Sequence, residues 1–134
     1  MTPISRDTLR QMKVVEDERK KAEQLDRIIS IIYKEVKDTA KIKGDTNYSH
    51  AIPIISQIRD FRGTMKYNYD VFYTTNMEEI LERIKALFPD CLVNKKTLSM
   101  GRDGKMYDIS SLCSTVAAFV DHSRDQDYIV VDWS

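Results

Sequence analysis

Residues 22–43 read AEQLDRIISIIYKEVKDTAKIK, and their apolar side chains recur every three or four positions. A helix brings residues at this spacing into one continuous stripe. The members of the stripe are Leu25, Ile28, Ile29, Ile32, Val36 and Ala40. Gly44 follows, and a glycine commonly ends a helix just past its last turn. The stretch therefore predicts a helix that docks on the body of the domain through this stripe.

The segment before the stripe has a helical composition but no full apolar face. No Pro or Gly interrupts residues 6–43, so the sequence predicts one long helix. Within it, EDERKK at residues 16–21 is polar all round and cannot be buried in the chain's own core. We therefore divide the chain into an exposed helical arm, residues 1–24, and a single α+β domain, residues 25–134.

This arm is the most informative feature of the sequence. One interpretation is that a neighbouring subunit orders it, and the other is a frayed, solvated extension, because isolated polar helices are marginal in water. Under the first interpretation, the predicted partner-binding residues are Leu9, Met12, Val15, Arg19, Lys20 and Lys21.

The next segments predict strands and a second helix. Ser49–Ile58 is apolar but contains Pro53, so it is an edge strand or a broken strand. Met65–Thr75 alternates with a period of two and places three tyrosines on one face, which predicts a strand. Asn76 then begins a helix through a capping box, and Pro89 ends that helix.

The C-terminal third predicts the remainder of a sheet. Tyr128–Trp133 is apolar on both faces, which is typical of a central strand. The elements expected before it are a strand over Cys91–Met100, a hairpin turn at Gly101–Gly104, a returning strand to Ile109, a short helix within residues 110–121 and a polar loop over residues 123–127. This order predicts an α+β fold: a long N-terminal helix plus a mainly antiparallel sheet packed by a second helix.

Charge and composition exclude several classes of protein. The 134 residues contain 21 Lys+Arg and 21 Asp+Glu and are 42% hydrophobic, which argues against a disordered chain and against a globally basic nucleic-acid binder. No apolar run approaches the ~20 residues that span a bilayer, and the N-terminus lacks the apolar core of a secretory signal. We therefore expect a cytoplasmic protein. The neutral total conceals a basic end, residues 1–44, and an acidic end, residues 108–134.

No motif in the sequence predicts a catalytic, cofactor or metal site. The nucleotide-binding glycine patterns, the zinc-protease motif and the serine-hydrolase motif are all missing. Cys113 and His122 offer the residue types of a thiol enzyme, but no family signature surrounds them. A buried thiol and a loop histidine is the simpler interpretation. A disulfide between Cys91 and Cys113 stays open.

A second candidate surface alternates basic and aromatic residues around the predicted strand at Met65–Thr75. Such a face can stack single-stranded bases, although alternating tyrosines are more often one buried face of a sheet. The residues of this alternative nucleic-acid face are Arg59, Arg62, Lys66, Tyr67, Tyr69 and Tyr73.

Four short segments carry a resemblance to a known group of proteins. They are Gly44–Tyr48, Asn76–Glu79, LFPDC at residues 87–91 and YIVVDWS at residues 128–134. In their order and spacing, residues 25–134 resemble small uncharacterised proteins of large eukaryotic (nucleocytoplasmic) DNA viruses. The resemblance implies a virion component, and it carries no catalytic residues over to this chain.

These observations together favour a non-enzymatic structural or assembly protein, such as a minor capsid protein. We expect protein partners, either other capsid proteins or a second copy of the chain, and we do not expect nucleic acid as the main partner. The alternative is a small regulatory adaptor or a nucleic-acid-binding module that uses the aromatic strand face. If the basic arm meets the acidic end of another copy, salt should weaken the association.

Overall fold

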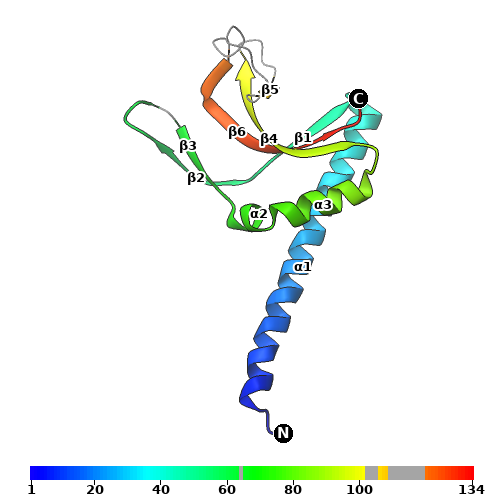
Figure 1. Ribbon diagram of the computed structural model, residues 1–134, viewed down its shortest axis with the longest axis vertical. Coiled ribbons are helices and arrows are strands. Elements are labelled where there is room, and N and C mark those ends of the chain that lie inside the picture. Colours follow the sequence, from blue (N-terminus) through cyan, green and yellow to red (C-terminus); the bar gives the residue numbers. More distant parts are fainter. Residues whose placement is uncertain (64, 102–105, 109–119) are drawn as a thin grey trace.

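The computed structural model describes residues 1–63, 65–101, 106–108 and 120–134. Its fold is the predicted α+β arrangement, in which a long N-terminal helix accompanies a curled antiparallel sheet and further helices (Figure 1). Within the described ranges, none of the helices combines the length and the apolar character that crossing a bilayer requires.

The first helix confirms the prediction from its apolar stripe as far as Val36, but Ala40 is wrong: it is exposed, and Thr39 is buried in its place, because the helix widens into a π-helical turn there. Helix α1 spans Arg6–Asp38 and continues into a π-helical turn, η1, over Thr39–Lys43. The Ser5 side chain caps the N-terminus by accepting a hydrogen bond from the backbone N–H of Thr8. Gly44 ends the helix with φ of 68°, a left-handed conformation that glycine adopts without the steric cost of a side chain.

Four strands form the main sheet in the order β1-β6-β4-β5, and every pairing is antiparallel. Strand β1 spans Asn47–Ala51, β4 spans Leu92–Gly101, β5 spans Met106–Asp108 and β6 spans Val120–Asp132. The inner position of β6 confirms the central strand predicted from its apolar residues. Strand β1 lies at an edge and ends before Pro53, as expected from the proline.

The predicted polar loop over residues 123–127 is wrong, because these residues belong to β6. Asp127 pairs with Thr97 in the ladder with β4, and it accepts a hydrogen bond from the Thr97 hydroxyl at 2.6 Å. Asp125 accepts a hydrogen bond from the buried Ser99 hydroxyl. These partners from β4 allow carboxylates to lie within a strand. The short helix expected within residues 110–121 lies largely outside the described residues, and Val120 is already strand.

The second sheet is a two-stranded antiparallel ribbon that projects from the body (Figure 1). It consists of β2, Ile54–Arg59, and β3, Met65–Tyr69. The strand predicted over Met65–Thr75 is therefore too long. Asp70 ends it, because its carboxylate accepts a hydrogen bond from the Phe72 backbone N–H at 2.9 Å and caps a short helix, α2, over Val71–Thr75.

The second long helix, α3, spans Met77–Leu87 and ends just before Pro89, as predicted. The predicted capping box at its start is wrong. The Asn76 side chain makes no cap hydrogen bond to α3, and its amide instead donates to the Phe72 carbonyl of α2 at 2.9 Å. Asn76 thus joins the two consecutive helices.

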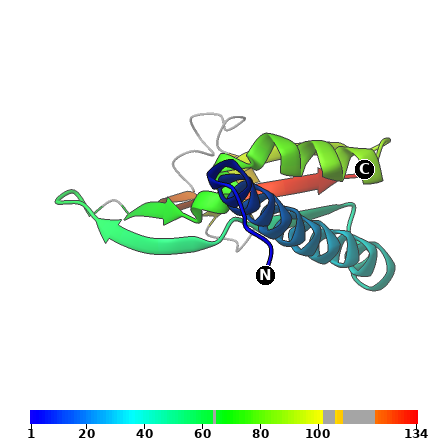
Figure 2. The same cartoon turned by 90° about the horizontal axis from the view of Figure 1, so that it is seen from below.

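One apolar core lies between the helices and the main sheet. Helices α1 and α3 lie side by side over one face of the sheet (Figure 2). The buried members of the core are Leu25, Ile28, Ile32, Val36, Ile52, Tyr73, Ile80, Ile84, Val93, Ile129 and Val131. The stripe of α1 supplies four of these residues, so the periodicity of residues 25–36 orients α1 against the sheet.

Candidate functional site

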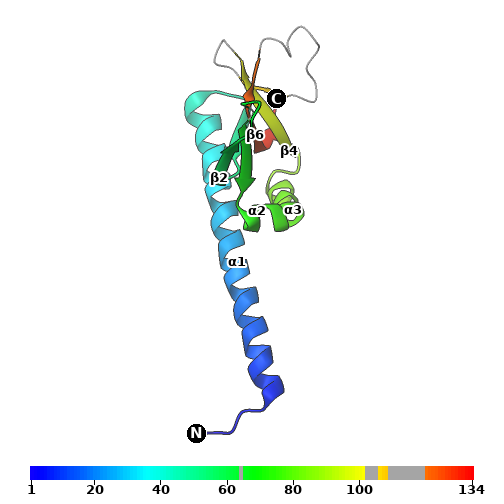
Figure 3. The same ribbon diagram turned by 90° about the vertical axis from the view of Figure 1, so that its left-hand side faces the viewer.

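The N-terminal half of α1 extends away from the body of the protein (Figure 3). From Met1 to Gln24 every residue is exposed except the half-buried Glu16, and Leu25 is the first buried residue of the helix. Three of the predicted partner-binding residues, Leu9, Met12 and Val15, are 53%, 51% and 55% exposed. These apolar side chains therefore face solvent on a helix that the core does not cover.

Ion pairs within the helix support this projecting segment. Arg19 bonds the carboxylate of Glu16 at 2.6 Å and also pairs with Glu23, while Lys13 bonds Asp17 at 2.9 Å. Pairs three or four residues apart favour the helical conformation, although water screens them where they are exposed. The Arg19 guanidinium also lowers the pKa of the Glu16 carboxyl. Arg19, one of the predicted partner-binding residues, is thus already engaged within its own helix.

The base of the arm is tied to α3. Lys21 forms an ion pair with Glu79 at 3.1 Å, and Asp26 accepts a bond from Arg83 at 3.1 Å. A shallow groove lies at this crossing, lined by Glu18, Lys21, Ala22, Leu25, Glu79 and Arg83. Lys21 therefore belongs to the junction with the body. Lys20, Leu9, Met12 and Val15 remain exposed on the arm.

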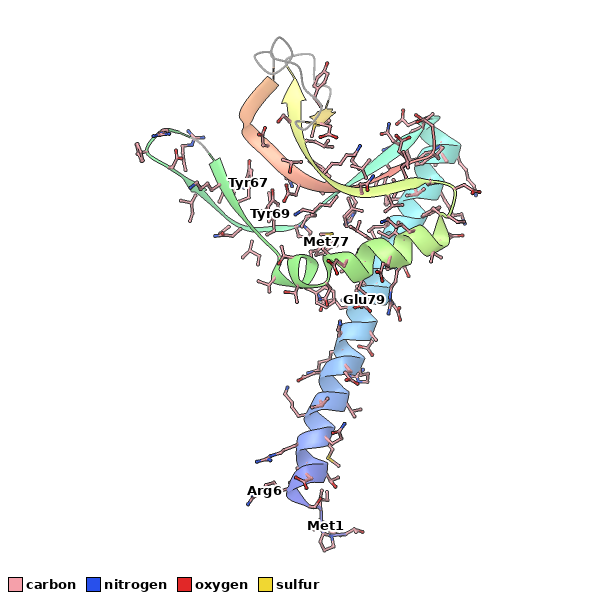
Figure 4. The ribbon with its side chains drawn as sticks, in the orientation of Figure 1. Met1, Arg6, Tyr67, Tyr69, Met77 and Glu79 are labelled. Atoms are coloured by element: carbon pink, nitrogen blue, oxygen red, sulfur yellow. The ribbon has the colours of Figure 1, made fainter. Side chains whose placement is uncertain are left out.

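The tyrosines of the alternative nucleic-acid face do not lie on one open strand. Tyr67 and Tyr69 project from β3 into the space between the ribbon and the main sheet (Figure 4). The Tyr69 hydroxyl there accepts a hydrogen bond from the backbone N–H of Asp127 at 2.9 Å. Tyr73 is buried and lies in α2, because β3 ends at Tyr69 and Asp70 caps the helix that follows. These side chains pack within the protein, as expected from the interpretation of the tyrosines as a buried face, and they do not form an open base-stacking face.

The basic residues of the same predicted face are all exposed on the ribbon. Lys66 pairs with Ile58 in the ladder, and successive residues of a strand point to opposite faces. Lys66 therefore lies on the face of β3 opposite Tyr67 and Tyr69. Arg59 pairs with Met65 and therefore lies on the tyrosine face of the ribbon, whereas Arg62 lies in the turn at its end, so the three cations do not share one surface with the tyrosines.

A histidine between two tyrosines is a feature that the sequence prediction missed. His50 Nδ1 lies 3.3 Å from the Tyr48 hydroxyl, and His50 Nε2 lies 3.2 Å from the Tyr73 hydroxyl. Burial lowers the pKa of His50, and the nearby Glu35 carboxylate partly opposes that shift. The signal in the sequence was the spacing of Tyr48 and His50, which places both on one face of β1.

We expect this histidine to make the fold sensitive to mild acid. Its folded-state pKa lies below the ordinary value of 6.5, so the unfolded chain binds the proton more readily. The contribution of the neutral His50 to the free energy of unfolding is therefore fully present above about pH 6.5 and is lost as the pH falls below that value. Urea unfolding at about pH 7.5 and about pH 5.5 should show this loss, and the variant His50→Gln should show a smaller one. An equal loss in the variant would assign the pH dependence to other groups.

The described residues contain no cluster of three or more His, Cys, Asp or Glu side chains that could hold a metal ion. Cys91 is a free, half-buried thiol. Cys113 lies outside the residues that the structure describes, so the Cys113–His122 pair stays a prediction; the interpretation of His122 as a loop histidine is wrong, because its backbone belongs to β6.

The fold and its surface define a class: an α+β domain that carries a projecting, largely polar helix and a projecting β-ribbon. Comparison of the chain with protein-family models, with curated proteins and with solved structures found no match.

Proposed function

We propose that the chain is a non-enzymatic assembly protein that contacts its neighbours through the N-terminal half of α1. The observation that supports this proposal is the exposure of Leu9, Met12 and Val15 on an arm that none of the other described residues covers. At 1.5 Å per residue, the segment from Arg6 to Lys21 extends about 24 Å. Apolar side chains along such a length offer a partner helix a surface to bury.

The physical argument concerns the stability of the arm. A helix of this length is marginal in water unless packing supports it, and among the described residues the arm is supported by its junction with the body and by exposed ion pairs. A partner that buries Leu9, Met12 and Val15 would remove apolar surface from water and stabilise the arm. The proposed partner is another copy of the chain or another protein of the same assembly.

The resemblance of residues 25–134 to small proteins of large DNA viruses extends this proposal. In its extended form, the assembly is a virion and the chain is a minor capsid component. The test is whether the chain remains with purified particles through density-gradient centrifugation and a high-salt wash. If the wash removes the chain from the particles, the chain is not a virion component, but the proposed assembly role is not contradicted.

Deleting residues 1–15 is expected to abolish self-association without unfolding the domain. The deletion removes Leu9, Met12 and Val15 but keeps the Lys21–Glu79 ion pair and all of the core residues. Size-exclusion chromatography with light scattering should show full-length oligomers and a truncated monomer. Thermal unfolding should be within a few degrees for the two proteins, because no buried side chain is lost.

A full-length protein that is monomeric at every concentration would contradict self-association. In that case, the same pair of proteins can be compared for pull-down of a purified neighbouring component of the assembly. A truncated protein that fails to fold would contradict the division between arm and domain.

A further inference from the structure

The β2–β3 ribbon is the second element that projects from the body. It extends beyond the main sheet, in a different direction from the arm (Figure 1). Ile55 and Ile58 of β2 are 65% and 59% exposed, and Phe61 in the turn is 94% exposed. The outer half of the ribbon therefore contributes little to the core and is open to a ligand.

Cations surround this outer half on three sides. Ile58 and Lys66 are paired in the ladder and share one face, whereas Arg59 is the next residue and points to the opposite face. Arg62 lies in the turn at the end of the ribbon, with its guanidinium 5.4 Å from the centre of the Phe61 ring. The ribbon thus carries one cation on each face and one at its tip.

These three cations are not neutralised within the part of the chain that the structure describes. No ion pair joins Arg59, Arg62 or Lys66 to a described carboxylate. The nearest acidic residue in sequence, Asp60, is engaged by the turn, where its carboxylate accepts the Arg62 backbone N–H at 2.9 Å. The positive charge is therefore available to an anionic ligand.

We propose that the β2–β3 ribbon binds double-stranded DNA by entering its major groove. The major groove is wide enough to admit a two-stranded β-ribbon, and phosphates line both of its walls. A ribbon with cations on both faces and at its tip matches two walls, whereas a flat anionic surface such as a membrane would meet one face only. The major groove of double-stranded RNA is too narrow for side chains to read, which favours DNA.

The proposal predicts a specific salt dependence. Three phosphate contacts give a slope of about −2.7 in log K against log salt, which is about a 40-fold loss of affinity between 50 and 200 mM. The test is fluorescence anisotropy of the full chain with a labelled duplex of mixed sequence. The triple variant Arg59→Gln, Arg62→Gln, Lys66→Gln should lose at least ten-fold in affinity and most of the slope.

The matched control removes three exposed cations from the other end of the body: Lys34→Gln, Lys41→Gln, Lys43→Gln. It changes the net charge equally and should keep the slope. Equal loss in both variants would assign binding to overall charge and overturn the proposal. Equal affinity for single-stranded and duplex DNA, binding to phosphatidylserine vesicles in place of DNA, or no binding at low salt would each overturn it as well. Circular dichroism checks that both variants fold.

Discussion

Replacing Ile32 with alanine is expected to lower the free energy of unfolding by about 2–5 kcal/mol. Ile32 is fully buried at the centre of the α1 stripe, packed with core residues from α3 and the main sheet. Truncating it removes apolar contacts and leaves a cavity that the close-packed neighbours fill only in part. Equilibrium unfolding in urea, followed by circular dichroism, measures the loss.

The adjacent residue provides a control on the same helix. Ile31 is chemically identical but 48% exposed, so Ile31→Ala removes less buried surface and should cost under about 1 kcal/mol. Both substitutions raise intrinsic helix propensity by the same amount, which removes propensity from the comparison. Equal losses in the two variants would contradict the placement of the helix on the sheet.

The helices were predictable because their signals are local. In α1 the apolar spacing from Leu25 to Val36 sets the buried face, and Gly44 sets the end. The central strand β6 was predictable near its C-terminal end, where Ile129 and Val131 are both fully buried. Each of these signals lies within a few turns or residues of the element that it specifies.

Two errors in the predicted sheet arose from side-chain and backbone hydrogen bonds that the spacing of apolar residues does not reveal. Residues 71–75 alternate like a strand, but Asp70 caps a helical turn and its backbone N–H donates to the Pro53 carbonyl at 2.8 Å. Residues 123–127 are polar like a loop, yet hydroxyl donors from β4 accommodate their carboxylates in β6. Spacing along one segment carries no information about such partners.

The candidate surfaces also combine features that a local sequence pattern predicts with features that depend on the three-dimensional fold. The absence of a full apolar face on residues 16–21 predicted a polar helical segment, and the structure leaves these residues outside the core. The basic–aromatic face required knowledge of register, since Lys66 and Tyr67 are neighbours in sequence but lie on opposite faces of β3. The contact of Lys21 with Glu79 could not be read from sequence either, because it depends on how α3 crosses α1.

Replacing Leu9, Met12 and Val15 together with glutamine is expected to abolish association through the arm. Glutamine is a good helix former and carries no charge, so the variant keeps both the helix and the net charge. Each half-exposed apolar side chain would contribute roughly 1 kcal/mol when a partner buries it. Loss of three such side chains should raise the dissociation constant at least 100-fold. Sedimentation velocity over a concentration series measures this change.

The matched control is Arg6→Gln, Arg10→Gln, Lys20→Gln, which leaves the apolar residues and removes three exposed cations. If burial of Leu9, Met12 and Val15 drives association, this control stays associated and shows little dependence on salt. If the basic arm instead meets the acidic C-terminal end of another copy, the control dissociates and the glutamine variant of the apolar residues keeps most of its affinity. The first variant removes apolar side chains and the second removes positive charges from the same helix. The pair of results therefore identifies whether apolar burial or charge attraction drives association through the arm.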